Sequence, residues 1–228
     1  MSDTQTLRTH AQEIFDSAVD AVNPASAVQR ALNETPIEGS PYVIAVGKAA
    51  SAMAGAARIE GAQEGLIVTN MGNARPRAGF QVLVGDHPVP GTGSLAGGDA
   101  VERALHEHED LLFLVSGGAS AMVCAPAGGV TVHDIVKTTE LLMHRGVDIH
   151  ELNTVRRHLS RIKGGQGIQE GQRVRALILS DVQGNDPAAI GSGLAAPDPT
   201  TYRDALRVLD RHGLMGAVSP AVRNHLEL

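Results

Sequence analysis

The chain alternates short apolar runs with longer segments in which apolar residues recur every three or four positions. Runs such as "YVIAV" and "GLIVT" are rich in β-branched residues and predict strands, because these residues suit a pleated backbone. The recurrent segments predict helices, whose buried stripe repeats about every 3.6 residues. The expected strands are 42–46, 65–69, 80–86, 111–115 and 175–180, and the expected helices are 6–23, 49–57, 94–108, 131–145, 149–163 and 200–212.

Strands that are apolar on both faces and alternate with helices predict a mostly parallel sheet with helices on both sides. We therefore predict an α/β fold, a Rossmann-like three-layer sandwich, formed by a single domain over residues 1–228. In open sheets of this kind, ligands bind beyond the carboxyl ends of the strands. Function is expected in the loops that follow the strands.

Composition narrows the choice of function. The 228 residues, 43% of them hydrophobic, suffice for a large core, while a net charge of −6 and 2% aromatic content argue against a nucleic-acid partner. The single cysteine, Cys124, excludes an internal disulfide, and no spacing typical of a zinc site occurs. Neither an apolar leader nor a run of membrane length is present, so we expect no membrane partner and a cytoplasmic location.

The loops after the first and third expected strands carry basic and acidic residues. Gly47-Lys48 is not a Walker A loop, because Tyr42 stands where that motif needs glycine. A helix start disfavours a cation, so Lys48 either faces an anion or is an ordinary solvated lysine. In "GDHPVPGTGS", Asp86 and His87 precede two prolines, and chemistry alone favours an ordinary stiff loop here.

The stretch "SGGAS" follows the strand 111–115 and predicts an anion site of backbone N–H groups and hydroxyls at a helix start. The residues that would contact the anion are Ser116, Gly117, Gly118 and Ser120. A second interpretation is a nucleophile elbow, a serine hydrolase using Ser120 with His87 or His158, although the last glycine of G-x-S-x-G is missing. A third is that the glycines only let a helix pack closely on the sheet.

Carboxylates and cations occupy the later loops. Asp181 and Asp186 follow the last strand, and Mg²⁺ on a nucleotide needs one or two such carboxylates. Asp198 instead fits the role of a capping residue at a helix start. Arg157 and Arg161 are four residues apart in the expected helix 149–163 and would share a face beside phosphate or carboxylate. Lys163 would lie on a flank of the same helix, where it also suits the helix end before two glycines.

Five motifs together resemble the glycerate 2-kinase family, some members of which carry the older label hydroxypyruvate reductase. The motifs are "VIAVGKAASAM", "GDHPVPG", "LVSGGASAM", "LNTVRRHLSRIKGGQ" and "LSDVQGNDPAAIGSGLAAPDPTTY", in the family's order over residues 42–214. The resemblance implies ATP-dependent phosphorylation of D-glycerate to 2-phosphoglycerate with Mg²⁺. A reductase is disfavoured, because no G-x-G-x-x-G follows the first strand.

The resemblance also assigns residues. It implies that Lys48 and the 116–120 loop neutralise phosphate, with Lys163 also at the cofactor. It further implies that Arg157 grips the glycerate carboxylate, and that Asp181, which is also expected to be catalytic, or Asp186 holds Mg²⁺. Phosphoryl transfer needs mainly such positioning and neutralisation of charge.

Departures from the family pattern lower the expected activity. Ala119 replaces a glycine, and its methyl group is expected to obstruct a phosphate. The chain resembles the family's N-terminal domain, and we expect its C-terminal domain to be absent, which would impair turnover. The alternative is a non-catalytic domain that binds a sugar acid or anion. A face left exposed in this way would favour a homodimer.

Overall fold

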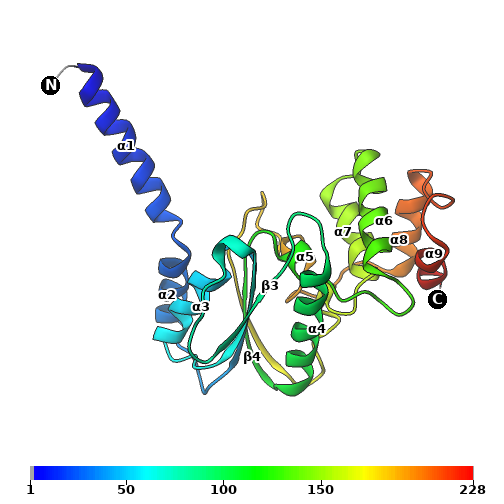
Figure 1. Cartoon of the computed structure of the whole chain (residues 1–228), viewed down its shortest axis with the longest axis horizontal. Coiled ribbons are helices and arrows are strands. Elements are labelled where there is room, and N and C mark those ends of the chain that lie inside the picture. The colour runs from blue at the N-terminus through cyan, green and yellow to red at the C-terminus, as the bar shows by residue number, and fades with distance from the viewer. Residues whose placement is uncertain (1–2, 228) are drawn as a thin grey trace.

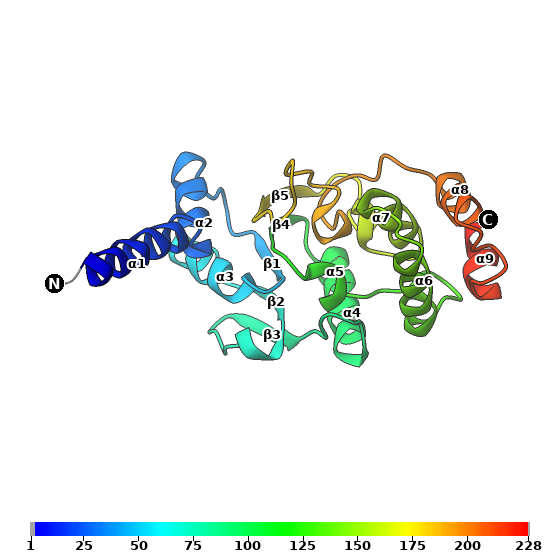
Figure 2. The same cartoon turned by 90° about the horizontal axis from the view of Figure 1, so that it is seen from above.

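The computed structural model describes residues 3–227, which contain a five-stranded sheet in the order β3-β2-β1-β4-β5 (Figures 1 and 2). All neighbouring strands are parallel. The strands are β1 (Tyr42–Val46), β2 (Gly65–Thr69), β3 (Phe80–Val84), β4 (Asp110–Val115) and β5 (Arg173–Ile178). All five predicted strands are present, within two residues of their expected ends, and the α/β prediction is confirmed.

Helices cover both faces of the sheet. α2 (Pro24–Glu34) and α3 (Ala50–Ile59) lie on one face, while α4 (Thr92–Glu107) and the single turn α5 (Ala119–Met122) lie on the other (Figure 2). The remaining helices are α1 (Asp3–Ala21), α6 (Val132–His144), α7 (Ile149–His158), α8 (Tyr202–Arg211) and α9 (Pro220–Leu226), with short 3₁₀ turns at Met71–Asn73, Lys163–Gly165 and Ile190–Ser192.

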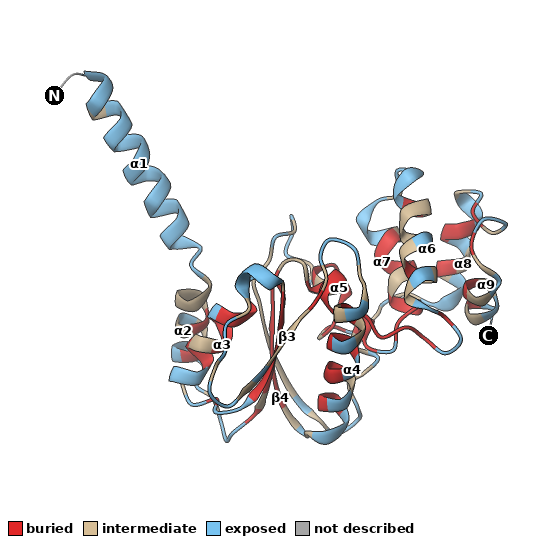
Figure 3. Ribbon diagram, in the orientation of Figure 1, coloured by how far each residue is buried: buried red, intermediate tan, exposed pale blue. Residues whose placement is uncertain are grey.

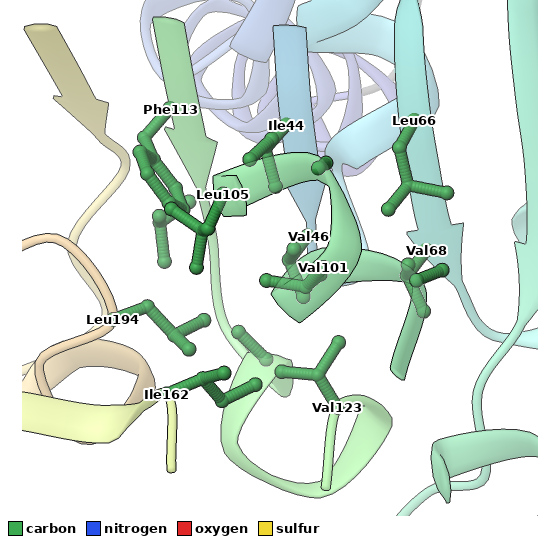
Figure 4. Close-up of a cluster of buried hydrophobic side chains, with 14 of the residues drawn as sticks. Ile44, Val46, Leu66, Val68, Val101, Leu105, Phe113, Val123, Ile162 and Leu194 are labelled. Carbon is green, nitrogen blue, oxygen red and sulfur yellow. The ribbon is translucent and has the colours of Figure 1, made fainter. Parts of the chain in front are cut away.

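The strand sequences explain the three layers. Along β1, Ile44 and Val46 enter the cluster under α4, while Val43 and Ala45 enter the cluster under α3. Successive strand side chains point to opposite faces, so a run that is apolar throughout supplies two cores. Figure 4 shows the first of these clusters, in which Val101 of α4 meets side chains from three strands.

Helices α6 to α9 form a third apolar cluster, separate from the two on the sheet. Figure 1 shows them gathered beside the sandwich, next to α5. The helical part of the chain thus has a core of its own. The prediction of one domain over 1–228 stays a prediction.

Two helices, α2 and α9, were not predicted, and both begin at a proline. Pro24 does end α1, but it also occupies the first turn of α2, where Asn23 accepts hydrogen bonds from Ala25 and Ser26 N–H groups. Pro220 begins α9 in the same way, with Ser219 as its cap. Proline suits this position because it has no N–H to leave unpaired.

The prediction of one helix over 149–163 is wrong, because α7 ends at His158. The backbone beyond it pairs elsewhere: Arg161 N–H donates to the Ala125 carbonyl, and Ser160 bridges to Pro126. Apolar positions continue to Ile162, which is buried although it lies in a turn. The periodic apolar pattern therefore extends beyond the end of the helix that it predicted.

Helix α1 projects from the molecule with every residue exposed except partly buried Thr6, as the pale blue ribbon in Figure 3 shows. Its large apolar side chains are Leu7, Ile14, Phe15 and Val19. No helix in residues 3–227 is long and apolar enough to cross a membrane.

Candidate functional site

Two loops are joined by hydrogen bonds at the carboxyl edge of the sheet. The Lys48 N–H donates to the Gly117 carbonyl over 3.0 Å, and the Ala49 N–H donates to Ser116 Oγ over 3.1 Å. The loops that follow the adjacent strands β1 and β4 are thus fixed against each other. A site built here is held by the sheet itself.

Backbone N–H groups in the second loop remain free. Neither Gly117 N–H nor Gly118 N–H has an acceptor among residues 3–227. Gly118 has a φ of 87°, a left-handed conformation that glycine adopts without strain. Ser116 differs, because its hydroxyl is buried and accepts from Ala49 N–H. The two glycines, rather than the Ser116 hydroxyl, are therefore the free donors to an anion.

Two titratable side chains flank this glycine pair. A Cβ on Gly117 would lie 2.3 Å from Asp181 Oδ2, and a Cβ on Gly118 would lie 3.1 Å from His87 Cδ2. Asp181 follows β5 and His87 follows β3, so residues from distant loops converge here. Both side chains are exposed.

Lys48 adds a positive charge to the same edge. It is exposed and forms no ion pair within the described chain. Burial, and then the charge of Lys48, lower the pKa of His87 below its ordinary value. The combination of a free cation with two free N–H groups is suited to a phosphate or carboxylate.

Ser120 lies in a chain of hydrogen bonds. Its hydroxyl is 2.7 Å from Ser192 Oγ, and Ser192 donates to Asn153 Oδ1 over 2.9 Å. The Asn153 amide in turn donates to the Ala189 carbonyl, which fixes its orientation. Ser192 has already used its proton, so Ser120 must donate to it. Ser120 has no histidine partner in the part of the chain described, and the geometry of a serine nucleophile is not assembled.

Arg157 is directed into the protein. Its side chain is only 5% exposed; Nε lies 2.9 Å from Asp198 Oδ1, and a second nitrogen donates to the Ala188 carbonyl. A third nitrogen donates to Thr200 Oγ1. Arg161 points elsewhere, to Glu102, so the two arginines do not form the predicted pair beside a ligand.

Lys163 is also buried rather than flanking a helix. Its Nζ donates to the carbonyls of Ser120 and Val123, over 2.9 and 3.0 Å, and thereby closes the end of α5. Burial lowers the pKa of Lys163 to about 8. We call the internal set of Asn153, Arg157, Lys163, Ser192 and Asp198 the buried polar lock.

The other two carboxylates in the last loop accept hydrogen bonds from backbone groups close to them in the sequence. Asp186 accepts from the Ala188 N–H and lies 3.9 Å from His150, so no contact joins it to Asp181. Asp198 accepts from the Thr200 N–H, as expected for a residue near a helix start. Ala119 is fully buried, and its methyl group faces Gly191. The expectation that this methyl obstructs a phosphate is therefore wrong.

The edge residues fit a nucleotide that carries Mg²⁺. Residues 3–227 hold no cluster of three potential metal ligands. Mg²⁺ on a nucleotide needs only one or two carboxylates, since phosphate oxygens supply other ligands. Asp181, exposed beside the glycine pair, is suited to that role, and its carboxylate can approach Gly117 closely because glycine has no Cβ.

The parallel sheet and the free donors at its carboxyl edge define a Rossmann-like α/β protein with a candidate anion site. The chain belongs to the family described as "Domain of unknown function (DUF4147)", whose model matches residues 10–227. Its predicted resemblance to proteins named glycerate 2-kinase and hydroxypyruvate reductase is confirmed over most of the chain.

Three relatives illustrate the similarity. The chain is 35% identical to the glycerate 2-kinase of Pyrococcus horikoshii, over 97% of its own length and 54% of the relative's. It is 38% identical to the D-glycerate 2-kinase of Thermotoga maritima, over 94% and 53%. A crystal structure of Thermotoga maritima glycerate kinase matches 97% of the chain and 55% of its own, with a TM-score of 0.89 and 36% identity. The chain thus spans about half the length of these relatives.

Proposed function

We propose that this chain provides the Mg-ATP and hydroxy-acid site of a glycerate 2-kinase, and so serves the phosphorylation of D-glycerate to 2-phosphoglycerate. One observation carries the proposal. Lys48, Asp181 and the free Gly117 and Gly118 N–H groups converge at one edge of the sheet and have no competing protein partners within residues 3–227. The names of the relatives, which span about twice this length, support the substrate.

Each edge residue has a part in this proposal. Lys48 and the two N–H groups neutralise the transferred phosphate, since phosphoryl transfer depends mainly on positioning and charge. Asp181 would hold Mg²⁺, which when bound neutralises phosphate charge. Arg157 and Lys163 take a different part from the one first expected, because both side chains are buried and donate to carbonyls inside the protein. We propose that they position α5 and the last loop.

The test is ADP release from Mg-ATP, with and without D-glycerate, by the wild type and Lys48→Ala. We expect release that depends on glycerate and falls by about 10²- to 10³-fold in the variant, the range for loss of one charge-stabilising group. Lys137→Ala, which removes an exposed lysine paired with Glu140, is the matched control and should match the wild type.

A contrary result would be equally informative. Binding of glycerate without any release of ADP would favour the alternative function, a domain that binds a sugar acid without turnover. Equal release by the wild type and Lys48→Ala would exclude Lys48 from the reaction.

A further inference from the structure

His87 lies at the same sheet edge and has no part in the proposed function. Its imidazole lies against the glycine pair: Cδ2 and Nε2 would be 3.1 and 3.3 Å from a Cβ on Gly118. Lys48 lies near enough for its charge to act on the ring. The imidazole therefore lies beside the donors that would receive the transferred phosphate.

The ring of His87 has no hydrogen-bond partner within residues 3–227, in contrast to the rings of His158 and His212. His158 Nδ1 is 2.8 Å from the Thr154 carbonyl, and His212 Nε2 is 2.8 Å from Glu151. Its neighbour Asp86 is engaged too, because it accepts from Ser94 N–H at the start of α4. His87 thus keeps both ring nitrogens available to a ligand.

The surroundings of His87 favour an uncharged ring. Lys48, from the loop after β1, is the charged group that acts on it, and burial acts in the same direction. Asp86 is turned toward Ser94, and Asp181 lies against the other glycine. A neutral imidazole has a lone pair that can accept a proton near pH 7.

We propose that His87 accepts the proton of the acceptor hydroxyl during phosphoryl transfer, an inference that rests on the proposed function. The hydroxyl O–H bond breaks and its proton passes to the imidazole, while the oxygen forms a bond to the γ-phosphorus. The bond from that phosphorus to the bridging oxygen breaks, and its electron pair leaves with ADP. The imidazolium then returns its proton to water.

Asp181 is the competing candidate for this proton. It lies against Gly117 and is the exposed carboxylate that fits Mg²⁺, so its oxygens would be occupied when a nucleotide is bound. Ser120 is not a candidate, because its hydroxyl is committed to Ser192. His87 is the remaining titratable group against the glycine pair.

The test compares the wild type, His87→Gln and the control His144→Gln, an exposed histidine on α6. We expect His87→Gln to lower kcat by about 10²- to 10⁴-fold, with little change in KM for ATP. The wild-type rate should fall at acid pH, as the imidazole with its lowered pKa becomes protonated, and this fall should be absent from His87→Gln. An active wild type whose rate and pH profile are unchanged by His87→Gln would overturn the inference and leave the proposed function standing.

A second measurement is independent of turnover. The imidazole proton resonance of His87, assigned by its loss in His87→Gln, is titrated by NMR in the wild type and in Lys48→Met. The inference requires that the pKa of His87 lie below the ordinary histidine value and rise when the Lys48 charge is removed. If the pKa is ordinary and indifferent to Lys48, the inference fails, whether or not glycerate is the substrate.

Discussion

The sheet edge and the buried polar lock use similar residues in opposite ways. At the edge, Lys48, His87 and Asp181 are exposed and have no protein partners within residues 3–227. In the lock, the charged groups of Arg157 and Lys163 donate to carbonyls, and Arg157 also approaches the Asp198 carboxylate. The difference shows that a charged residue in a motif is informative about ligands only when its polar atoms remain free.

The two regions are physically connected. Lys163 closes the end of α5, the turn that begins directly after Gly118. Ser120 of the same turn is bonded to Ser192, and Ser192 is bonded to Asn153 of α7. The hydrogen bonds of the buried polar lock therefore fix α5 and, with it, the adjacent glycine pair. The sheet edge itself remains open to a ligand.

The largest expected effect is the loss of stability when the buried polar lock loses Arg157. Arg157→Leu leaves the largely buried Asp198 carboxylate without its arginine partner, so we expect the free energy of unfolding to fall by about 3 to 5 kcal/mol. Arg207→Leu, which removes an exposed arginine paired with Asp204, should cost about 0 to 1 kcal/mol. Urea unfolding measures both, and equal losses would mean that Arg157 is not a structural residue.

A smaller effect should come from filling the space at the edge. Gly117→Ala places a methyl group against the exposed Asp181 carboxylate, which can move into solvent. We expect the affinity for Mg-ATP to fall about tenfold, equivalent to about 1.4 kcal/mol, with little loss of stability. Gly128→Ala is the matched control, because a Cβ there meets nothing within 4 Å. Calorimetric titration with Mg-ATP would contradict the prediction if both variants bound equally.

The last expected effect is a pH dependence of stability due to Lys163. Its pKa is about 8 in the folded protein and 10.5 in the unfolded chain, so between these values the unfolded chain binds more protons. Stability should therefore rise with pH across this window, by at most about 1.4 kcal/mol per pH unit. Lys163→Met should remove this contribution. Unfolding curves whose pH dependence is the same in both proteins would show that Lys163 does not titrate in this window.

The strands were predictable because each is a short apolar run that supplies both cores, as Ile44 and Val43 illustrate. The burial of the Arg157 side chain was not predictable from the sequence. Its partner Asp198 lies 41 positions away, and no local pattern of residues indicates the pairing. From the sequence, His87 was a candidate only as a partner of Ser120. Its approach to Gly118 depends on the packing of the loop after β3 against α5, where a Cβ on Gly85 would meet the Met122 carbonyl.

The central claim is that the edge residues serve a ligand and do not contribute to the stability of the fold. Its most direct test is the shift in thermal unfolding midpoint caused by Mg-ATP in the wild type and in Lys48→Met, because a ligand stabilises only the state that binds it. The account predicts a shift in the wild type that is lost in Lys48→Met, with equal midpoints in the absence of nucleotide. A shift of the same size in both proteins would contradict it.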